Sequence, residues 1–213
     1  MFPFFEELST LEKLVFLKAA GIISAEPELP AEYKRLIGFT FNNNAYFEIT
    51  GFKLRGSDTL RFSFKATGNN ACNVLGAYDG ASEQSNYSLY VGSASNAKYL
   101  RYNGGTYSSR IVFDEQYNVV LTPTGSSGML ADSQWTEQEF ESAVNLCIGT
   151  TSPSATSSKM VGDIPGEIVV DGRLKLIPSE RISDNALGYY DTSSETFYEP
   201  VGDGLISMGY ANG

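Results

Sequence analysis

Apolar and polar residues alternate with a period of two along most of the chain. The pattern is clearest at 59–65, 72–78, 87–91 and 117–122. Such alternation is typical of half-buried β-strands, because successive side chains of a strand point to opposite faces of its sheet. Short stretches rich in Gly, Ser, Asn and Asp separate these segments. We therefore predict an all-β sandwich from Phe39 onward.

The clearest predicted hairpin joins 166–170 to 174–178 through Asp171-Gly172, a dipeptide typical of tight β-turns. Further strands are predicted at 46–54, 97–102, 110–113, 144–148, 187–190 and 196–199. Residues 123–135, rich in Gly and Ser, are predicted to form a loop. The segment 137–143 is compatible with a short helix or with the lead-in to the next strand.

The N-terminal segment follows a helical pattern instead. Ser9 and Glu12 have the spacing of a capping box, and Gly21 supplies a C-terminal stop, so we predict a short α-helix over 9–20. Two prolines between positions 24 and 30 favour an extended linker after it.

The chain is therefore predicted to comprise an N-terminal anchor helix with its linker, 1–28, and a β domain, 29–213. The N-terminal part carries more apolar surface than a lone helix can leave exposed. We expect it to dock either onto its own domain or onto partner chains. The candidate partner-binding residues are Phe2, Phe4, Phe5, Leu11, Leu14 and Val15.

The N-terminal segment lacks the basic region of a signal peptide, and its apolar run is too short to span a bilayer, so no membrane anchor is expected.

The net charge of the chain excludes some classes of binding partner. Of the 213 residues 42% are hydrophobic, enough for a sizeable core, and the formal net charge is −10. A strongly acidic chain repels the phosphates of nucleic acids and anionic membrane surfaces. We therefore expect neither nucleic acid nor membrane as a partner.

The chain offers little catalytic chemistry. It contains no histidine, which excludes Ser-His-Asp and Cys-His triads and histidine-ligated zinc. Glu137, Glu139 and Glu141 would share one face of a strand, but we interpret them as a solvated acidic face. The sequence therefore predicts a protein that is not an enzyme and that has no catalytic residues.

No metal or cofactor is predicted. Cys72 and Cys147 fit no CxxC spacing, and we expect buried free thiols rather than a disulfide. Asp184-Asn185 and Gly202-Asp203-Gly204 offer oxygen ligands but lack the spacing of a calcium loop.

A sugar ligand usually requires an exposed aromatic plate flanked by hydrogen-bonding groups, because a pyranose has an apolar face and a polar rim. We expect Trp135, the sole tryptophan, to be the most exposed candidate. The candidate ligand-binding residues are Tyr90, Tyr99, Arg101, Tyr107 and Trp135.

Two groups of motifs resemble a known family. The opening strings are LPAEYKRL at 29–36 and YFEITGFK at 46–53, and the closing strings are DGRL from Asp171, GYYD from Gly188 and FY from Phe197. Together they resemble concanavalin A-like/laminin-G-like jelly-roll domains of phage structural proteins and gut-bacterial surface proteins. The likeness covers 29–207, although the middle, 121–144, departs from the usual pattern. It implies an antiparallel jelly-roll sandwich and recognition of a carbohydrate or a surface.

These observations lead to one functional hypothesis and two alternatives. The hypothesis is a phage virion protein, an accessory tail or head-fibre subunit that displays a lectin-like domain for attachment to host-surface glycans. Its N-terminal helix would bind other virion proteins, and the chain would form a homo-oligomer, a trimer by analogy with fibres. The alternatives are a purely structural decoration protein and a carbohydrate-binding module on a bacterial cell surface.

Overall fold

The computed structural model of the protein describes residues 29–68, 71–78, 87–91, 97–103, 105–129, 132–153 and 159–211. The chain divides into two compact units, Met1–Pro30 and Ala31–Gly213. The predicted helix over 9–20 and the six candidate partner-binding residues lie outside the described residues. All the described strands belong to the second unit.

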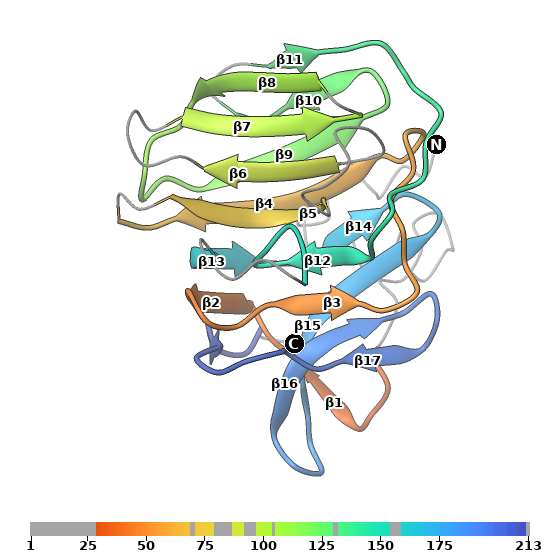
Figure 1. Ribbon diagram of the computed structural model, residues 1–213. Helices are drawn as coiled ribbons and strands as arrows, with labels where there is room; N and C mark the ends of the chain where they lie inside the picture. Colours follow the sequence, from red (N-terminus) through yellow and green to blue (C-terminus); the bar gives the residue numbers. More distant parts are fainter. Residues whose placement is uncertain are drawn as a thin grey trace, which may run out of the picture. The chain divides into compact units, whose positions relative to one another are not determined.

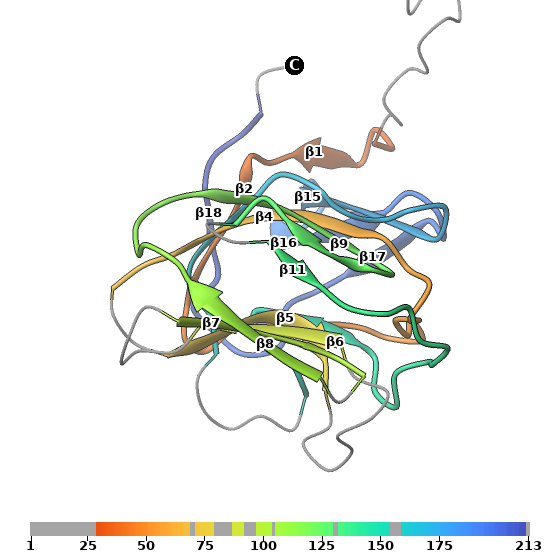
Figure 2. The same ribbon diagram turned by 90° about the horizontal axis from the view of Figure 1, so that it is seen from above.

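The described residues of this unit form two β-sheets that face each other as layers (Figures 1 and 2). The larger sheet has twelve strands. Its main path runs in the order β11 (Ser133–Gln134), β10 (Gly125–Ser127), β9 (Tyr117–Thr122), β4 (Leu60–Ala66), β14 (Ile168–Val170), β15 (Leu174–Arg181), β16 (Ala186–Asp191) and β17 (Thr196–Tyr198).

Four further strands complete the larger sheet. They are β1 (Tyr33–Arg35), which pairs with β15, and β2 (Gly38–Asn42), β13 (Val161–Pro165) and β18 (Ile206–Ser207). Strand β13 pairs with both β2 and β4, and β18 pairs with β2.

The smaller sheet has six strands, in the order β3 (Phe47–Ile49), β12 (Leu146–Ile148), β5 (Cys72–Ala77), β6 (Tyr87–Val91), β7 (Ala97–Tyr102) and β8 (Gly105–Arg110). Every pairing between described strands is antiparallel. The predicted all-β antiparallel sandwich is therefore confirmed. None of the described segments forms a helix with the length and apolar character needed to cross a bilayer.

The core lies between the layers, and sequence alternation decides which residues enter it. In β4, Phe62 and Phe64 are buried whereas Arg61 is exposed and Ser63 is half-buried. The same alternation places Val119 of β9 inside. Burial of such side chains contributes about 1.5–3 kcal/mol each, which is the main stabilisation of a sandwich of this kind.

Turn chemistry fixes the predicted hairpin between β14 and β15. Asp171, Gly172 and Arg173 connect the strands, and Gly172 has φ of +71°, a left-handed conformation that glycine adopts without steric cost. The predicted hairpin is therefore confirmed, and β15 continues beyond it to Arg181.

Several sequence predictions need correction. The strand predicted at 110–113 is β8, displaced towards the N-terminus to Gly105–Arg110. The predicted loop at 123–135 contains β10 and β11. Of the two alternatives for the segment 137–143, the helix is wrong: the segment is the lead-in to β12 (Leu146–Ile148), with one isolated bridge between Arg55 and Glu141.

Candidate functional site

Three of the predicted ligand residues occupy neighbouring register positions in the smaller sheet. Tyr90 in β6 pairs with Tyr99 in β7, and Arg101 pairs with Ser88. Tyr90 is half-buried and alternates with the fully buried Leu89. These three residues, which were predicted from the sequence as ligand contacts, therefore lie in one part of the smaller sheet.

The other two predicted ligand residues belong to the interior. Trp135 is only 8% exposed, and its ring stacks 5.0 Å from Tyr102 and lies 5.1 Å from Tyr107. Tyr107 is partly buried against the same core. The expectation that Trp135 is exposed is therefore wrong: it follows β11 and fills the space between the layers. The five residues do not form one site.

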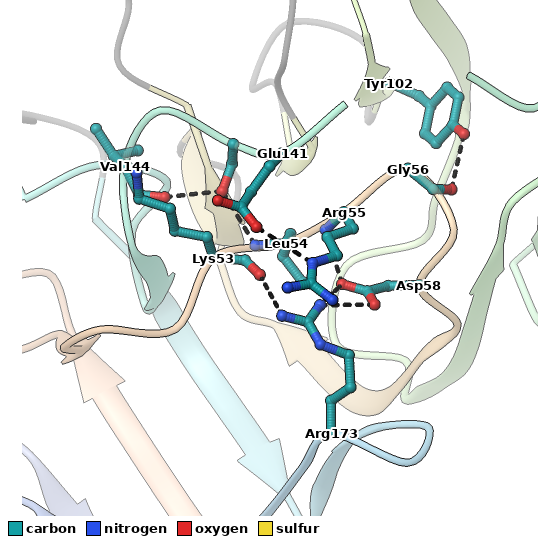
Figure 3. A network of polar contacts seen from close by, with 10 residues as sticks. Lys53, Leu54, Arg55, Gly56, Asp58, Tyr102, Glu141, Val144 and Arg173 are labelled. Atoms are coloured by element: carbon teal, nitrogen blue, oxygen red, sulfur yellow. Dashed lines mark hydrogen bonds and ion pairs between the residues drawn. The ribbon is translucent and has the colours of Figure 1, made fainter. Parts of the chain in front are cut away.

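A polar network ties the segment before β4 to neighbouring segments (Figure 3). Its centre is the buried carboxylate of Asp58. Arg173 Nη1 donates to both Asp58 oxygens, at 2.7 and 2.5 Å, and the backbone N of Arg55 donates to Oδ2 at 2.7 Å. Arg173 also donates to Lys53 O at 3.0 Å and lies over the ring of Phe52. With its oxygens so occupied, Asp58 acts as a cross-link.

The outer part of the network is an exposed pair between Arg55 Nε and Glu141 Oε2, 3.2 Å apart (Figure 3). Glu137 and Glu139 are exposed as well. The interpretation of these glutamates as a solvated acidic face is confirmed. Within the described ranges, no three Asp, Glu or Cys side chains gather in a way that would hold a metal ion.

The family-like motifs at the two ends of the domain build the scaffold. Tyr189 is fully buried, and its ring lies 4.8 Å from Phe47 and 5.1 Å from Phe39. Asp191 is also buried and accepts hydrogen bonds from the backbone N of Lys175 and of Ser193. These residues hold strands together and are not available to a ligand.

Both cysteines are buried free thiols, as predicted. Burial, with a smaller contribution from the charge of Glu48, raises the pKa of Cys147 to about 12. Burial also raises the pKa of Cys72. Because the thiolate is the reactive form, neither thiol is suited to nucleophilic chemistry.

The outer face of the larger sheet has a depression of about 280 Å³ across β9, β4 and β14. Two rows of side chains line it. In the first row, Arg61 lies between its partners Val120 and Val169. In the second, Ser63 Oγ donates to Asn118 Oδ1 at 2.7 Å, and Glu167 directly precedes β14. Aliphatic groups, hydrogen-bond donors and acceptors thus meet on one open face.

Ion pairs hold the charged groups around this depression. The guanidinium of Arg61 donates to both oxygens of Asp171, at 3.2 and 3.1 Å. Glu167 accepts from Arg35 through Oε1 and pairs with Lys175 Nζ at 2.9 Å through Oε2. The side chains that would contact a ligand are therefore already oriented before it binds.

Sequence reasoning missed this depression. Its residues come from three strands that are far apart in the sequence, and none of them belongs to a recognisable motif. The one available signal was alternation, which predicts that Arg61 and Asn118 face outward but not that β9, β4 and β14 are neighbours.

Comparisons with known proteins give structural neighbours only. No protein-family model matches the chain, and no curated protein sequence matches it. Among solved structures, the chain is similar to the CBM40 of a Ruminococcus gnavus sialidase bound to α2,3-sialyllactose, with 16% identity and a TM-score of 0.44 over 65% of this chain and 89% of that one. It is also similar to a heptameric SAP-like pentraxin from Limulus polyphemus, with 11% identity and a TM-score of 0.45 over 88% of this chain and 98% of that one. At these identities and TM-scores the likeness carries no information about ligand or assembly.

Proposed function

We propose that this domain is a non-catalytic, lectin-like module of the concanavalin A-like jelly-roll kind that binds a carbohydrate in the depression across β9, β4 and β14. The observation that carries the proposal is the composition of that depression. It combines aliphatic side chains with hydrogen-bond donors and acceptors on an open sheet face.

The chemistry of a sugar fits this combination. A sugar hydroxyl both donates and accepts hydrogen bonds, and the Asn118 amide can do the same. Arg61 donates and Glu167 accepts, so each supplies a charge-assisted hydrogen bond. The methyl groups of Val120 and Val169 would contact the apolar face of a pyranose. Both carboxylates of this face, Glu167 and Asp171, serve as partners of cations, which suits recognition rather than proton transfer.

The test is glycan binding by the full chain, first on a printed glycan array and then by calorimetry with the best glycan. We expect Arg61→Ala and Asn118→Ala each to weaken binding by about tenfold, the effect of losing one charge-assisted or well-placed hydrogen bond. Arg55→Ala removes a comparably exposed arginine elsewhere on the domain and is the matched control. Loss of binding in Tyr90→Ala but not in Arg61→Ala would show that the glycan binds the smaller sheet instead, where Tyr90, Tyr99 and Arg101 were predicted to contact it.

We further propose that this module is part of a phage virion and attaches it to host-surface glycans. The N-terminal segment would bind other virion proteins and hold the chain in an oligomer. This proposal rests on the sequence resemblance and on the apolar residues before position 16. Light scattering of the full chain tests it: Leu11→Asp with Leu14→Asp should lower the mass to that of a monomer, whereas Lys13→Asp should not. A monomeric wild-type chain would favour the bacterial-surface module, and an oligomer that binds no glycan would favour a decoration protein.

A further inference from the structure

The depression across β9, β4 and β14 combines unused hydrogen-bond donors with a positive balance of charge. We propose that it takes one anionic sugar ring, whose carboxylate or sulfate group binds the outward edge of Arg61 while a ring hydroxyl binds Asn118. The inference rests on the proposed function and specifies the ligand of the same site.

The side chains that would contact this ring are accessible to solvent. Arg61 and Asn118 are exposed, and Val120, Glu167 and Val169 are half-buried. The depression has a volume of about 280 Å³, at the lower end of the range of about 300–1,000 Å³ that is usual for ligand pockets. It therefore has the size of a site for one sugar ring, and the rest of a longer glycan would extend into solvent.

Arg61 has one edge of its guanidinium left for a ligand. Its Nε donates to Asp171 Oδ1 at 3.2 Å and its Nη2 to Oδ2 at 3.1 Å, which occupies the inner edge. Among the residues that the structure describes, none accepts from Nη1 or from the second N–H of Nη2, and half of the side chain is exposed, at 50%. Such an edge can donate two parallel hydrogen bonds to a carboxylate or sulfate. Asp171 thus orients Arg61 without blocking it.

Asn118 supplies a second set of donors at a suitable separation. Its Oδ1 accepts from Ser63 Oγ at 2.7 Å, and its amide N–H groups have no acceptor within the described part of the chain. Arg61 pairs with Val120 and Ser63 with Asn118, so Arg61 and Asn118 are diagonal neighbours on one sheet face. The Cβ atoms of such neighbours lie about 7 Å apart, a gap that one sugar ring can bridge. A ring with its anionic group at Arg61 would therefore present a hydroxyl to Asn118.

The local charge balance favours an anion. The charged residues that line the depression are Arg61 and Glu167, and their ion-pair partners are Asp171, Arg35 and Lys175. These side chains carry three positive and two negative charges, on a chain whose formal net charge is −10. At physiological ionic strength, exposed charges more than about 8–10 Å away are largely screened. A single anionic group bound at Arg61 would therefore respond mainly to this positive balance.

The experiment is calorimetry of the full chain at pH 7 with matched sugars. The probes are the methyl glycosides of glucuronate, galacturonate and mannuronate, the methyl ester of each as its neutral control, and galactose 6-sulfate as a second anion. For at least one uronate we expect binding about tenfold tighter than that of its ester, the effect of one charge-assisted pair. Raising NaCl from about 50 mM to about 500 mM should weaken binding of the uronate but not of the ester.

Variants of one residue locate the anionic group. Arg61→Ala should bind the uronate and its ester equally, whereas Arg61→Lys, which keeps the charge without the planar fork, should keep part of the preference. Arg55→Ala, the exposed control, should show the wild-type preference. A preference that survives in Arg61→Ala would overturn the assignment of the anion to this residue.

The outcomes separate this inference from the proposed function. Binding of galactose 6-sulfate alone would support the inference and identify sulfate as the anion. Esters that bind as tightly as their uronates, or a glycan array on which only neutral glycans bind, would overturn the inference while the carbohydrate module stands. If neither the array nor the calorimetry detects binding, both proposals fail. The comparison of uronate with ester needs only the wild-type chain, so it decides the matter even if a variant is too unstable to use.

Discussion

The ring of Tyr33, near the start of the domain, lies 4.8 Å from the ring of Tyr190, near its end. The contact adds to the three-residue ladder between β1 and β15 and to the ion pairs of Lys34 with Glu180 and of Arg35 with Glu167. Two of the family-like motifs recognised in the sequence therefore meet in space. Their aromatic residues serve to close the domain at this corner of the larger sheet.

We expect Tyr33→Ala to lower the free energy of unfolding by about 1–3 kcal/mol, because it removes two ring contacts and part of the cover over Tyr190. Tyr33→Phe should stay within about 0.5 kcal/mol of wild type, a range usual for changes that touch no such feature. Urea unfolding followed by circular dichroism measures both. An equal loss in the two variants would show that the hydroxyl, and not the ring, holds β1.

The ion pair between Asp58 and Arg173 should contribute far more to the free energy of unfolding than the exposed pair between Arg55 and Glu141. Arg173→Ala leaves the Asp58 carboxylate buried with one of its partners gone, and breaking a buried pair in this way costs about 3–5 kcal/mol. Glu141→Ala removes an exposed partner, which costs at most about 1 kcal/mol. Thermal and urea unfolding of both variants tests the difference, and similar losses would mean that the network of Figure 3 is not a cross-link.

The burial of Trp135 gives a spectroscopic prediction. As the sole tryptophan, packed between Tyr102 and Tyr107, it should emit at short wavelength and resist quenching by acrylamide in the native state. Trp135→Ala should lower the free energy of unfolding by about 3–5 kcal/mol. A bound glycan should leave the emission unchanged, since the depression lies on the outer face of the sheet. Strong quenching of the native protein would instead support the sequence-based expectation of an exposed ring.

Local patterns in the sequence predicted much of the fold. Strands such as β4 and β9 combine strict alternation with aromatic or β-branched residues, and the turn at Gly172 has a conformation that suits glycine. These features are decided within a few residues. The all-β class and the main hairpin followed from them.

The parts of the fold and of the candidate site that were not predicted depend on contacts between segments that are distant in the sequence. Strand β10 consists of Gly125 and two serines, so it has no apolar alternation, and its pairing with β9 and β11 alone makes it a strand. Trp135 follows this irregular stretch and was therefore predicted to be exposed. Arg61 and Val169 become neighbours only through the order of strands in the sheet, which no local pattern contains.

Alkaline pH should destabilise the protein through its buried thiols. In the folded state burial, together with the charge of Glu48, raises the pKa of Cys147 to about 12, whereas an unfolded thiol ionises near its ordinary pKa of about 8.5. Below the unfolded pKa both states hold the proton and stability does not depend on this group. As the pH rises between the two pKa values, the unfolded state loses the proton first and the free energy of unfolding falls.

We expect this thiol to remove about 1 kcal/mol of stability between pH 9 and pH 10. Urea unfolding at several pH values should show a smaller decline in Cys147→Ala, which has no thiol to ionise at this position. The thiol reagent DTNB should label the native protein slowly at pH 8 and the urea-unfolded chain quickly. Fast labelling of the native protein would contradict the burial of the two cysteines.

The depression on the larger sheet takes its residues from β4, β9 and β14, and β14 is the last of these three strands to be synthesised. A nascent chain that has emerged only as far as β13 already holds Arg61 and Asn118, but it lacks Glu167 and Val169. The depression is therefore completed late in synthesis. A ribosome-bound chain lacks one of its three strands until most of the domain has been made.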